Sequence, residues 1–274
     1  MTDQIRDLES QLAAAATEIE KIDILHILAW ELKDRDPQRA RLLAQTAHDL
    51  ARLNDYPSGL AHSLKTLGFS NGFAGEYELA LAQLLEAKTL FEELDERSGQ
   101  STVLWILGAV QWHLGNYGEA LEYSLQALQI AEEIGNRPNQ AEAINNIAII
   151  YGDRGDQSQA ITTYKKALTI FQELDDKRGQ AWLLNNMAVD YYQLANHSEA
   201  LGCGLAGLNL VQQTGDRLLE VYLHGTLGEI YLEMGQFEQA LDAFQRGLEL
   251  SKTLGFRRNE QSTLFSIGQV YYRQ

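Results

Sequence analysis

The segment LGEIYLEMGQFEQALDAF, Leu227–Phe244, decides the fold of this chain. Its glycine, tyrosine, glycine and alanine recur along the sequence at intervals of forty residues. The alanine shows the interval most clearly, and it lies at Ala40, Ala80, Ala120, Ala160, Ala200 and Ala240. Self-similarity at a fixed period of this length is the signature of a stacked repeat architecture.

Each unit of the repeat has the pattern of two helices. In the clearest copy the first helix is expected near residues 138–154 and ends at Gly155, and the second is expected near 157–174. A glycine at this point suits a left-handed C-terminal cap. Gly75, Gly115 and Gly235 hold the same position in other copies, whereas Ala195 departs from it. The small residue that precedes the alanine by twelve positions is Gly68, Gly108, Ala148, Ala188 or Gly228, and Gly268 continues the series.

These motifs resemble the tetratricopeptide repeat, whose pattern of L-G-x2-Y followed by A-x3-F is present in Leu227–Phe244. A period of forty residues alone would also fit a HEAT repeat, but the fixed Gly–Tyr–Gly–Ala spacing favours the tetratricopeptide repeat. The doubled phrases NNIA and NNMA, which begin at Asn145 and Asn185, are most similar to the long-repeat subtype of kinesin light chains. The resemblance implies an all-α fold, a right-handed superhelical solenoid of antiparallel helix pairs.

The repeats divide the chain into three parts. We expect an N-terminal capping helix in residues 1–17, and then six repeats of about forty residues in 18–256. Residues 257–274 are expected to form the first helix of a seventh, incomplete repeat, with a C-terminal capping helix as the alternative. Phe265, Val270 and Tyr272 would leave this last helix apolar beyond its core stripe. We therefore expect a truncated longer protein, with possible self-association through this helix.

Composition and charge restrict the partners. The chain has 274 residues with a formal net charge of −16, and so acidic a surface repels phosphate backbones, which argues against nucleic acid. A basic peptide or protein suits this charge better. The single cysteine, Cys203, fits a reducing compartment, and neither a secretion signal nor an apolar run of membrane-spanning length is present. We expect a cytoplasmic protein with no membrane partner.

Candidate binding residues follow from the helical period of about 100° per residue. In the fourth repeat Glu142, Asn146, Ile149 and Asp153 lie opposite the core stripe. The resemblance implies that this opposite face lines a concave groove that binds a protein or peptide segment. The predicted peptide-binding residues are His62, Phe69, Ile106, His113, Glu142, Asn146, Asp153, Trp182, Asn186, Gln193, Tyr222, Glu229 and Glu233.

The two groove asparagines suggest a mechanism. An amide side chain carries both a donor and an acceptor, so Asn146 and Asn186 are suited to pair with the main chain of an extended peptide. Apolar contacts and acidic steering of Lys or Arg would complete the binding. The alternative is that the amides bond to neighbouring helices, and that Trp182 and Tyr222 pack between repeats instead of anchoring a ligand.

Other motifs carry no chemistry that we can identify. The string GCGLAG, Gly202–Gly207, lies inside a predicted helix, which excludes the dinucleotide fingerprint. We find no nucleophile–base pair, phosphate loop or metal-ligand spacing, so we expect no enzyme, catalytic residue, cofactor or metal. The groove rows have Lys33 and Arg273 at opposite ends and nothing basic between, which argues against a carboxylate clamp. The alternative function is an N-terminal sensory or regulatory region of a larger bacterial signalling enzyme, a nucleotide cyclase or histidine kinase, that acts by intramolecular contact or dimerisation.

Overall fold

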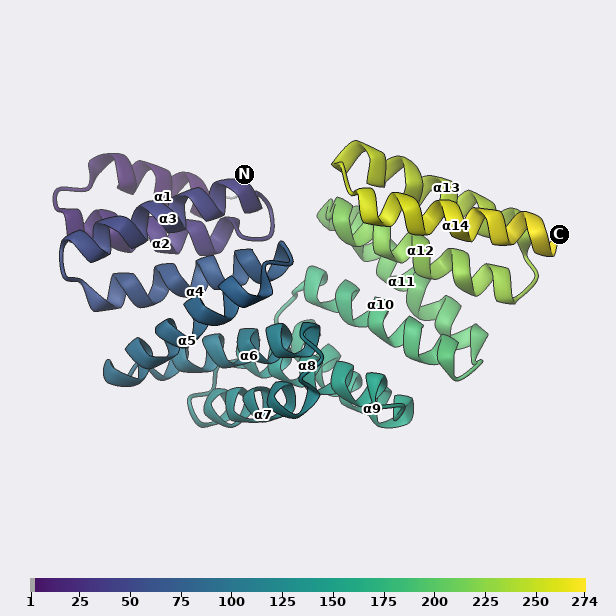
Figure 1. Cartoon of the computed structure of the whole chain (residues 1–274), viewed down its shortest axis with the longest axis horizontal. Helices are drawn as coiled ribbons and strands as arrows, with labels where there is room; N and C mark the ends of the chain where they lie inside the picture. The colour runs from purple at the N-terminus through teal and green to yellow at the C-terminus, as the bar shows by residue number, and fades with distance from the viewer. Residues whose placement is uncertain (1–2) are drawn as a thin grey trace. The chain divides into compact units, whose positions relative to one another are not determined.

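The computed structural model describes residues 3–274, and it shows a chain of helices joined by short turns (Figure 1). Within these residues there are fourteen α-helices. Their bounds are α1 (Asp3–Ala14), α2 (Glu18–Leu32), α3 (Pro37–Leu53), α4 (Pro57–Phe73), α5 (Tyr77–Glu93), α6 (Arg97–His113), α7 (Tyr117–Glu133), α8 (Arg137–Asp153), α9 (Gln157–Glu173), α10 (Lys177–Gln193), α11 (His197–Thr214), α12 (Arg217–Glu233), α13 (Phe237–Leu254) and α14 (Arg257–Arg273).

Successive helices pack as antiparallel pairs. The closest associations are between an even-numbered helix and the odd-numbered helix that follows it, as in α4 with α5, α6 with α7 and α12 with α13. The helices form two compact units, of which the N-terminal one ends at Asn146 and the C-terminal one begins at Ile147. This boundary lies inside α8.

Local signals in the sequence fix the helix ends. Gly155 has φ +88°, so it occupies the left-handed conformation that glycine adopts without strain. Ala195 takes the same conformation, with φ +54°, although its side chain makes this unfavourable. At the start of α2, the Thr17 hydroxyl accepts a hydrogen bond from the Glu20 amide at 3.1 Å, which confirms the predicted cap. Pro37 and Pro57 each open a helix, because the first turn requires no amide donor from them.

The core of each pair depends on small residues that let two helices approach closely. The repeating alanines from Ala40 to Ala240 are 0% exposed. A Cβ added at Gly228 would lie 2.4 Å from Cε1 of Phe244, so the glycine on α12 makes room for the phenyl ring on α13. Gly68 does the same for Leu84, at 2.5 Å. The equivalent Gly268 on α14 has nothing within 4 Å of such a Cβ.

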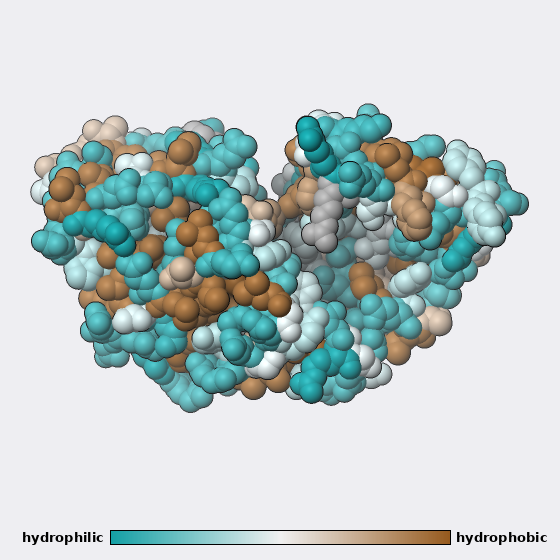
Figure 2. Space-filling view, viewed as in Figure 1, coloured by the Kyte–Doolittle hydropathy of each residue, from teal (hydrophilic) through white to brown (hydrophobic). Residues whose placement is uncertain are grey.

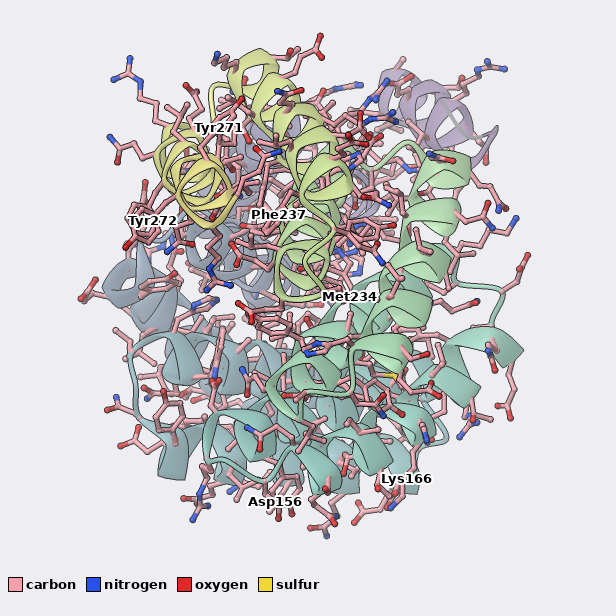
Figure 3. All side chains as sticks on the ribbon, turned by 90° about the vertical axis from the view of Figure 1, so that its right-hand side faces the viewer. Asp156, Lys166, Met234, Phe237, Tyr271 and Tyr272 are labelled. Atoms are coloured by element: carbon pink, nitrogen blue, oxygen red, sulfur yellow. The ribbon has the colours of Figure 1, made fainter. Side chains whose placement is uncertain are left out.

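The last helix covers the preceding pair with only one side. Val270 is 0% exposed and packs in the cluster of Leu232, Ala240 and Phe244, so the expectation that it lies outside the core is wrong. Phe265 is 69% exposed and Tyr272 is 91% exposed. Figure 3 shows Tyr271 and Tyr272 on this helix, near the surface of the C-terminal unit. None of the described helices is long and apolar enough to cross a membrane.

Candidate functional site

The predicted binding residues lie on the even-numbered helices. Their shared position is the side of the helix opposite the core stripe, and we call this surface the even-helix face. Because the two compact units are described separately, the face has an N-terminal part on α2, α4, α6 and the start of α8, and a C-terminal part on the end of α8, α10, α12 and α14.

Aromatic rings gather on the N-terminal part. The centroid of the Phe69 ring lies 5.7 Å from that of Trp30, 6.1 Å from that of Trp105 and 6.4 Å from that of Phe73. Phe73 is 51% exposed, so this cluster reaches the surface. Figure 2 shows brown, hydrophobic residues exposed among hydrophilic ones on the N-terminal unit. The arrangement offers apolar contact area to a ligand.

Two lysines lie against the same aromatic cluster. The Nζ atom of Lys65 is 4.3 Å from the centroid of the Trp30 ring, and that of Lys33 is 4.5 Å from it. Lys65 is buried, and this burial lowers its pKa to about 8, although Glu96 opposes the shift and Lys33 adds to it. Sequence reasoning missed Lys65, because its column on the helix lies beside the predicted groove row.

The predicted histidines occupy different surroundings. The His62 ring stacks on that of His26, with centroids 4.4 Å apart, and His62 Nε2 lies 3.1 Å from a Glu96 carboxylate oxygen. Burial, followed by the nearness of His62 and Lys65, lowers the pKa of His26 to about 3, so His26 is neutral at pH 7. His113 is exposed and stacks on Tyr77, with centroids 4.8 Å apart.

Two predicted groove residues are buried between helices. The Nδ2 atom of Asn146 donates a hydrogen bond to the Trp105 carbonyl oxygen at 2.7 Å, and the residue is 7% exposed. Ile106 is 2% exposed and belongs to the core of the N-terminal unit. The expectation that these two side chains face an open groove is therefore wrong, since neighbouring helices cover them. For Asn146 the alternative, an amide that bonds to a neighbouring helix, describes the contact.

The rings in the C-terminal part pack across repeats. The Trp182 and Tyr222 centroids are 5.6 Å apart, and Tyr222 lies edge-on to Phe256 at 5.9 Å. These are contacts between successive helix pairs, as the alternative interpretation expected. Asn185, the other half of the doubled phrase, accepts a hydrogen bond from the Thr226 hydroxyl at 3.0 Å. Asn186 is half-buried beside it, as Glu142 is in the N-terminal part.

The late acidic residues of this part already have partners. Glu229 accepts a hydrogen bond from the Ser266 hydroxyl at 2.7 Å, and Glu233 forms an ion pair with Arg273 at 2.6 Å. The exposed Gln193 accepts from Gln157 at 2.8 Å. Such contacts with α14 reduce the negative charge that Glu229 and Glu233 offer to a ligand.

One more acidic group belongs to this part. Asp153 is exposed, and it lies near Asp190, whose pKa is raised to about 7 mainly by burial and further by Asp153. Among the residues that the structure describes, no group of three or more His, Cys, Asp or Glu is placed to hold a metal ion. The chemistry that this surface offers is therefore aromatic, amide and charged contacts.

Comparison with known proteins identifies the family. The sequence profile of the family described as Tetratricopeptide repeat matches residues 99–173 and 179–253, which is more than half of the chain. The chain belongs to the tetratricopeptide repeat family. The fold is accordingly an all-α solenoid of sequential antiparallel helix pairs, as the sequence predicted. A comparison with curated protein sequences finds no match.

Solved structures with the same fold include proteins whose titles record bound peptides. BtubC (BKLC) from P. vanneervenii is 22% identical, with 90% of this chain and 92% of that one covered and a TM-score of 0.60. NprR in complex with its cognate peptide NprX is 17% identical, with coverages of 96% and 78% and a TM-score of 0.75. A Rap protein complexed with Competence and Sporulation Factor is 13% identical, with coverages of 99% and 80% and a TM-score of 0.69.

Proposed function

We propose that this chain is a non-enzymatic interaction module that binds an extended protein or peptide segment on its even-helix face. The observation that carries the proposal is the surface aromatic cluster of Trp30, Phe69 and Phe73, because exposed aromatic groups beside charged ones are typical of binding surfaces. The titles of NprR and Rap, which name bound peptides, support the same class of ligand.

Several residues would contribute in different ways. Phe69 and Phe73 would supply apolar contact, and the exposed His113 would add a polar one. In the C-terminal unit Asn186, Gln193 and Asp153 remain candidates for polar contacts with a peptide. The net charge of −16 would attract a segment that contains Lys or Arg, an effect that salt screens.

Peptide display followed by calorimetry tests this function. Peptides selected on the whole chain would be titrated against Phe73→Ser and, as a control, Leu42→Ser on α3. Leu42 is 69% exposed, so both variants remove an exposed apolar side chain, but only Phe73 lies on the even-helix face. We expect Phe73→Ser to weaken binding about tenfold, which corresponds to about 1.4 kcal/mol. If no peptide is selected, or if both variants bind as tightly as the unaltered chain, the proposed function is wrong.

A second candidate function is regulation by self-association, as in the sensory region of a larger signalling enzyme. The exposed Phe265 and Tyr272 on α14 favour it, because large exposed apolar groups mark contact surfaces. Catalysis does not follow from the fold, although a similar structure, 13% identical, is titled aspartyl phosphate phosphatase F from Bacillus subtilis. Analytical ultracentrifugation would test self-association: the unaltered chain should form dimers that Phe265→Ser/Tyr272→Ser abolishes. A chain that stays monomeric at all concentrations would refute this second function.

A further inference from the structure

The ammonium group of Lys65 is buried without a carboxylate partner. Lys65 is 8% exposed, and its Nζ atom has one hydrogen-bonding neighbour, His62 Nδ1 at 3.3 Å. Among residues 3–274 no acidic group forms an ion pair with it, since the nearby Glu96 is bound to His62 Nε2. An ammonium group has three donors, so the imidazole nitrogen leaves part of this donor capacity unused.

A second ammonium group lies beside the first. Lys33 Nζ is 4.5 Å from the centroid of the Trp30 ring that Lys65 also contacts, and it is 5.8 Å from that of Phe69. Asp34 neutralises Lys33, at 3.0 Å. The pair of lysines therefore carries one positive charge in excess, held between aromatic rings where burial makes an unpaired charge unfavourable.

An unsatisfied donor belongs to the same cluster. The indole Nε1 of Trp105 is buried and has no hydrogen-bond partner, and the residue is 8% exposed. Its ring lies edge-on to Phe69, with centroids 6.1 Å apart. Buried N–H groups are nearly always paired, so an orphaned one indicates a missing acceptor. Lys65, Lys33 and Trp105 thus lie around one phenyl ring, that of Phe69.

We propose that this cluster is a subsite for one carboxylate of the bound peptide, which the ammonium of Lys65 and the indole N–H of Trp105 would hold next to Phe69. The inference rests on the proposed function and adds to it an acidic residue, or a free C-terminus, in the part of the ligand that meets the N-terminal unit. A carboxylate carries the single negative charge that matches the excess positive charge of the two lysines. It is an acceptor only, as donors of this kind require.

A titration with small carboxylates tests the subsite without a peptide. The probes are N-acetylglutamate α-amide, which has only a side-chain carboxylate, and N-acetylglycine, which has only a main-chain one. N-acetylglutamine amide is the neutral control. The signal is the indole resonance of Trp105 in a nitrogen-15 correlation spectrum, assigned with Trp105→Phe. We expect at least one carboxylate probe to shift this resonance at millimolar concentration, and the neutral probe to leave it unchanged.

Two lysine variants separate the subsite from general charge. Lys65→Met removes the ammonium and keeps the chain length, and we expect it to weaken binding of the carboxylate probe at least tenfold. The matched control is Lys166→Met on α9, an exposed lysine of the C-terminal unit (Figure 3), which should bind the probe as the unaltered chain does. Thermal unfolding of Lys65→Met should occur no lower than that of the unaltered chain, because an apolar group replaces an unpaired buried charge.

The outcomes distinguish the inference from the proposed function. If display-selected peptides bind but show no preference for Asp, Glu or a free C-terminus, and no carboxylate probe shifts Trp105, the subsite is refuted and the proposed function stands. If the carboxylate probe binds but no peptide is ever selected, the subsite stands and the proposed function fails. A shift that Lys65→Met leaves intact, or one that the neutral probe also produces, refutes the subsite.

Discussion

Replacing Asn146 by alanine should destabilise the N-terminal unit. The Asn146 amide donates to the Trp105 carbonyl at 2.7 Å, and this contact links α8 to α6, the helix at the equivalent place in the preceding repeat. Asn146 is 7% exposed, so water cannot fully replace the lost donor. A buried hydrogen bond of this kind contributes about 1–2 kcal/mol. For a unit of this size the loss corresponds to a fall in Tm of about 2–6 °C.

Asn209→Ala is the matched control for this prediction. Asn209 also lies inside a helix, α11, but it is exposed. The same substitution there removes no inter-helix contact, and alanine has the higher helix propensity, so we expect stability to stay equal or rise by up to about 0.7 kcal/mol. Differential scanning calorimetry of both variants gives the comparison. If Asn146→Ala melts together with Asn209→Ala, the bond to Trp105 contributes nothing, and the reasoning that makes Asn146 structural is refuted.

Three further substitutions test the packing by thermal or denaturant unfolding. Gly228→Ala should destabilise by about 1–3 kcal/mol because the new methyl meets a phenyl ring at 2.4 Å, whereas the equivalent Gly268→Ala, with open space around it, should stabilise by up to about 1 kcal/mol; equal effects would contradict this. Ala195→Gly should stabilise by about 1 kcal/mol, since φ is +54° there, and a loss of stability would argue against strain. The pKa of Asp190 is raised from 3.8 to about 7 by burial, so its contribution to stability should fall as pH rises between these values, and Asp190→Asn should flatten this part of the pH profile; a parallel profile would contradict the shift.

The sequence predicted the repeat and its helix ends well, because these depend on short-range chemistry. Gly155 was expected to end a helix near residue 154, and α8 ends at Asp153 with Gly155 in the left-handed conformation. His224 was expected on a core stripe, and it is 6% exposed. The left-handed caps formed by aspartate were not foreseen: Asp95 has φ +51° at the end of α5, in place of the usual glycine.

The candidate site was harder to predict because it depends on how successive pairs stack. A helical wheel gives the direction of a side chain on its own helix but not the neighbour that covers it. Asn146 points away from the core stripe and is nevertheless covered, since its amide reaches a carbonyl 41 residues earlier. Lys65 shows the same limit, because only the inter-helix distances place its ammonium against Trp30, a residue of the preceding repeat. Long-range offsets of this kind are absent from the pattern of a single repeat.

The most direct test of the proposed binding face is photo-crosslinking of a display-selected peptide to two forms of the whole chain. In one form p-benzoylphenylalanine takes the place of Phe73 on α4, and in the other it takes the place of Leu42 on α3. Both positions are exposed, at 51% and 69%, so both reactive groups are accessible to solvent. We predict that the peptide crosslinks from position 73 and not from position 42, and that an excess of unlabelled peptide prevents the crosslink. Crosslinking from position 42 alone would contradict binding on the even-helix face.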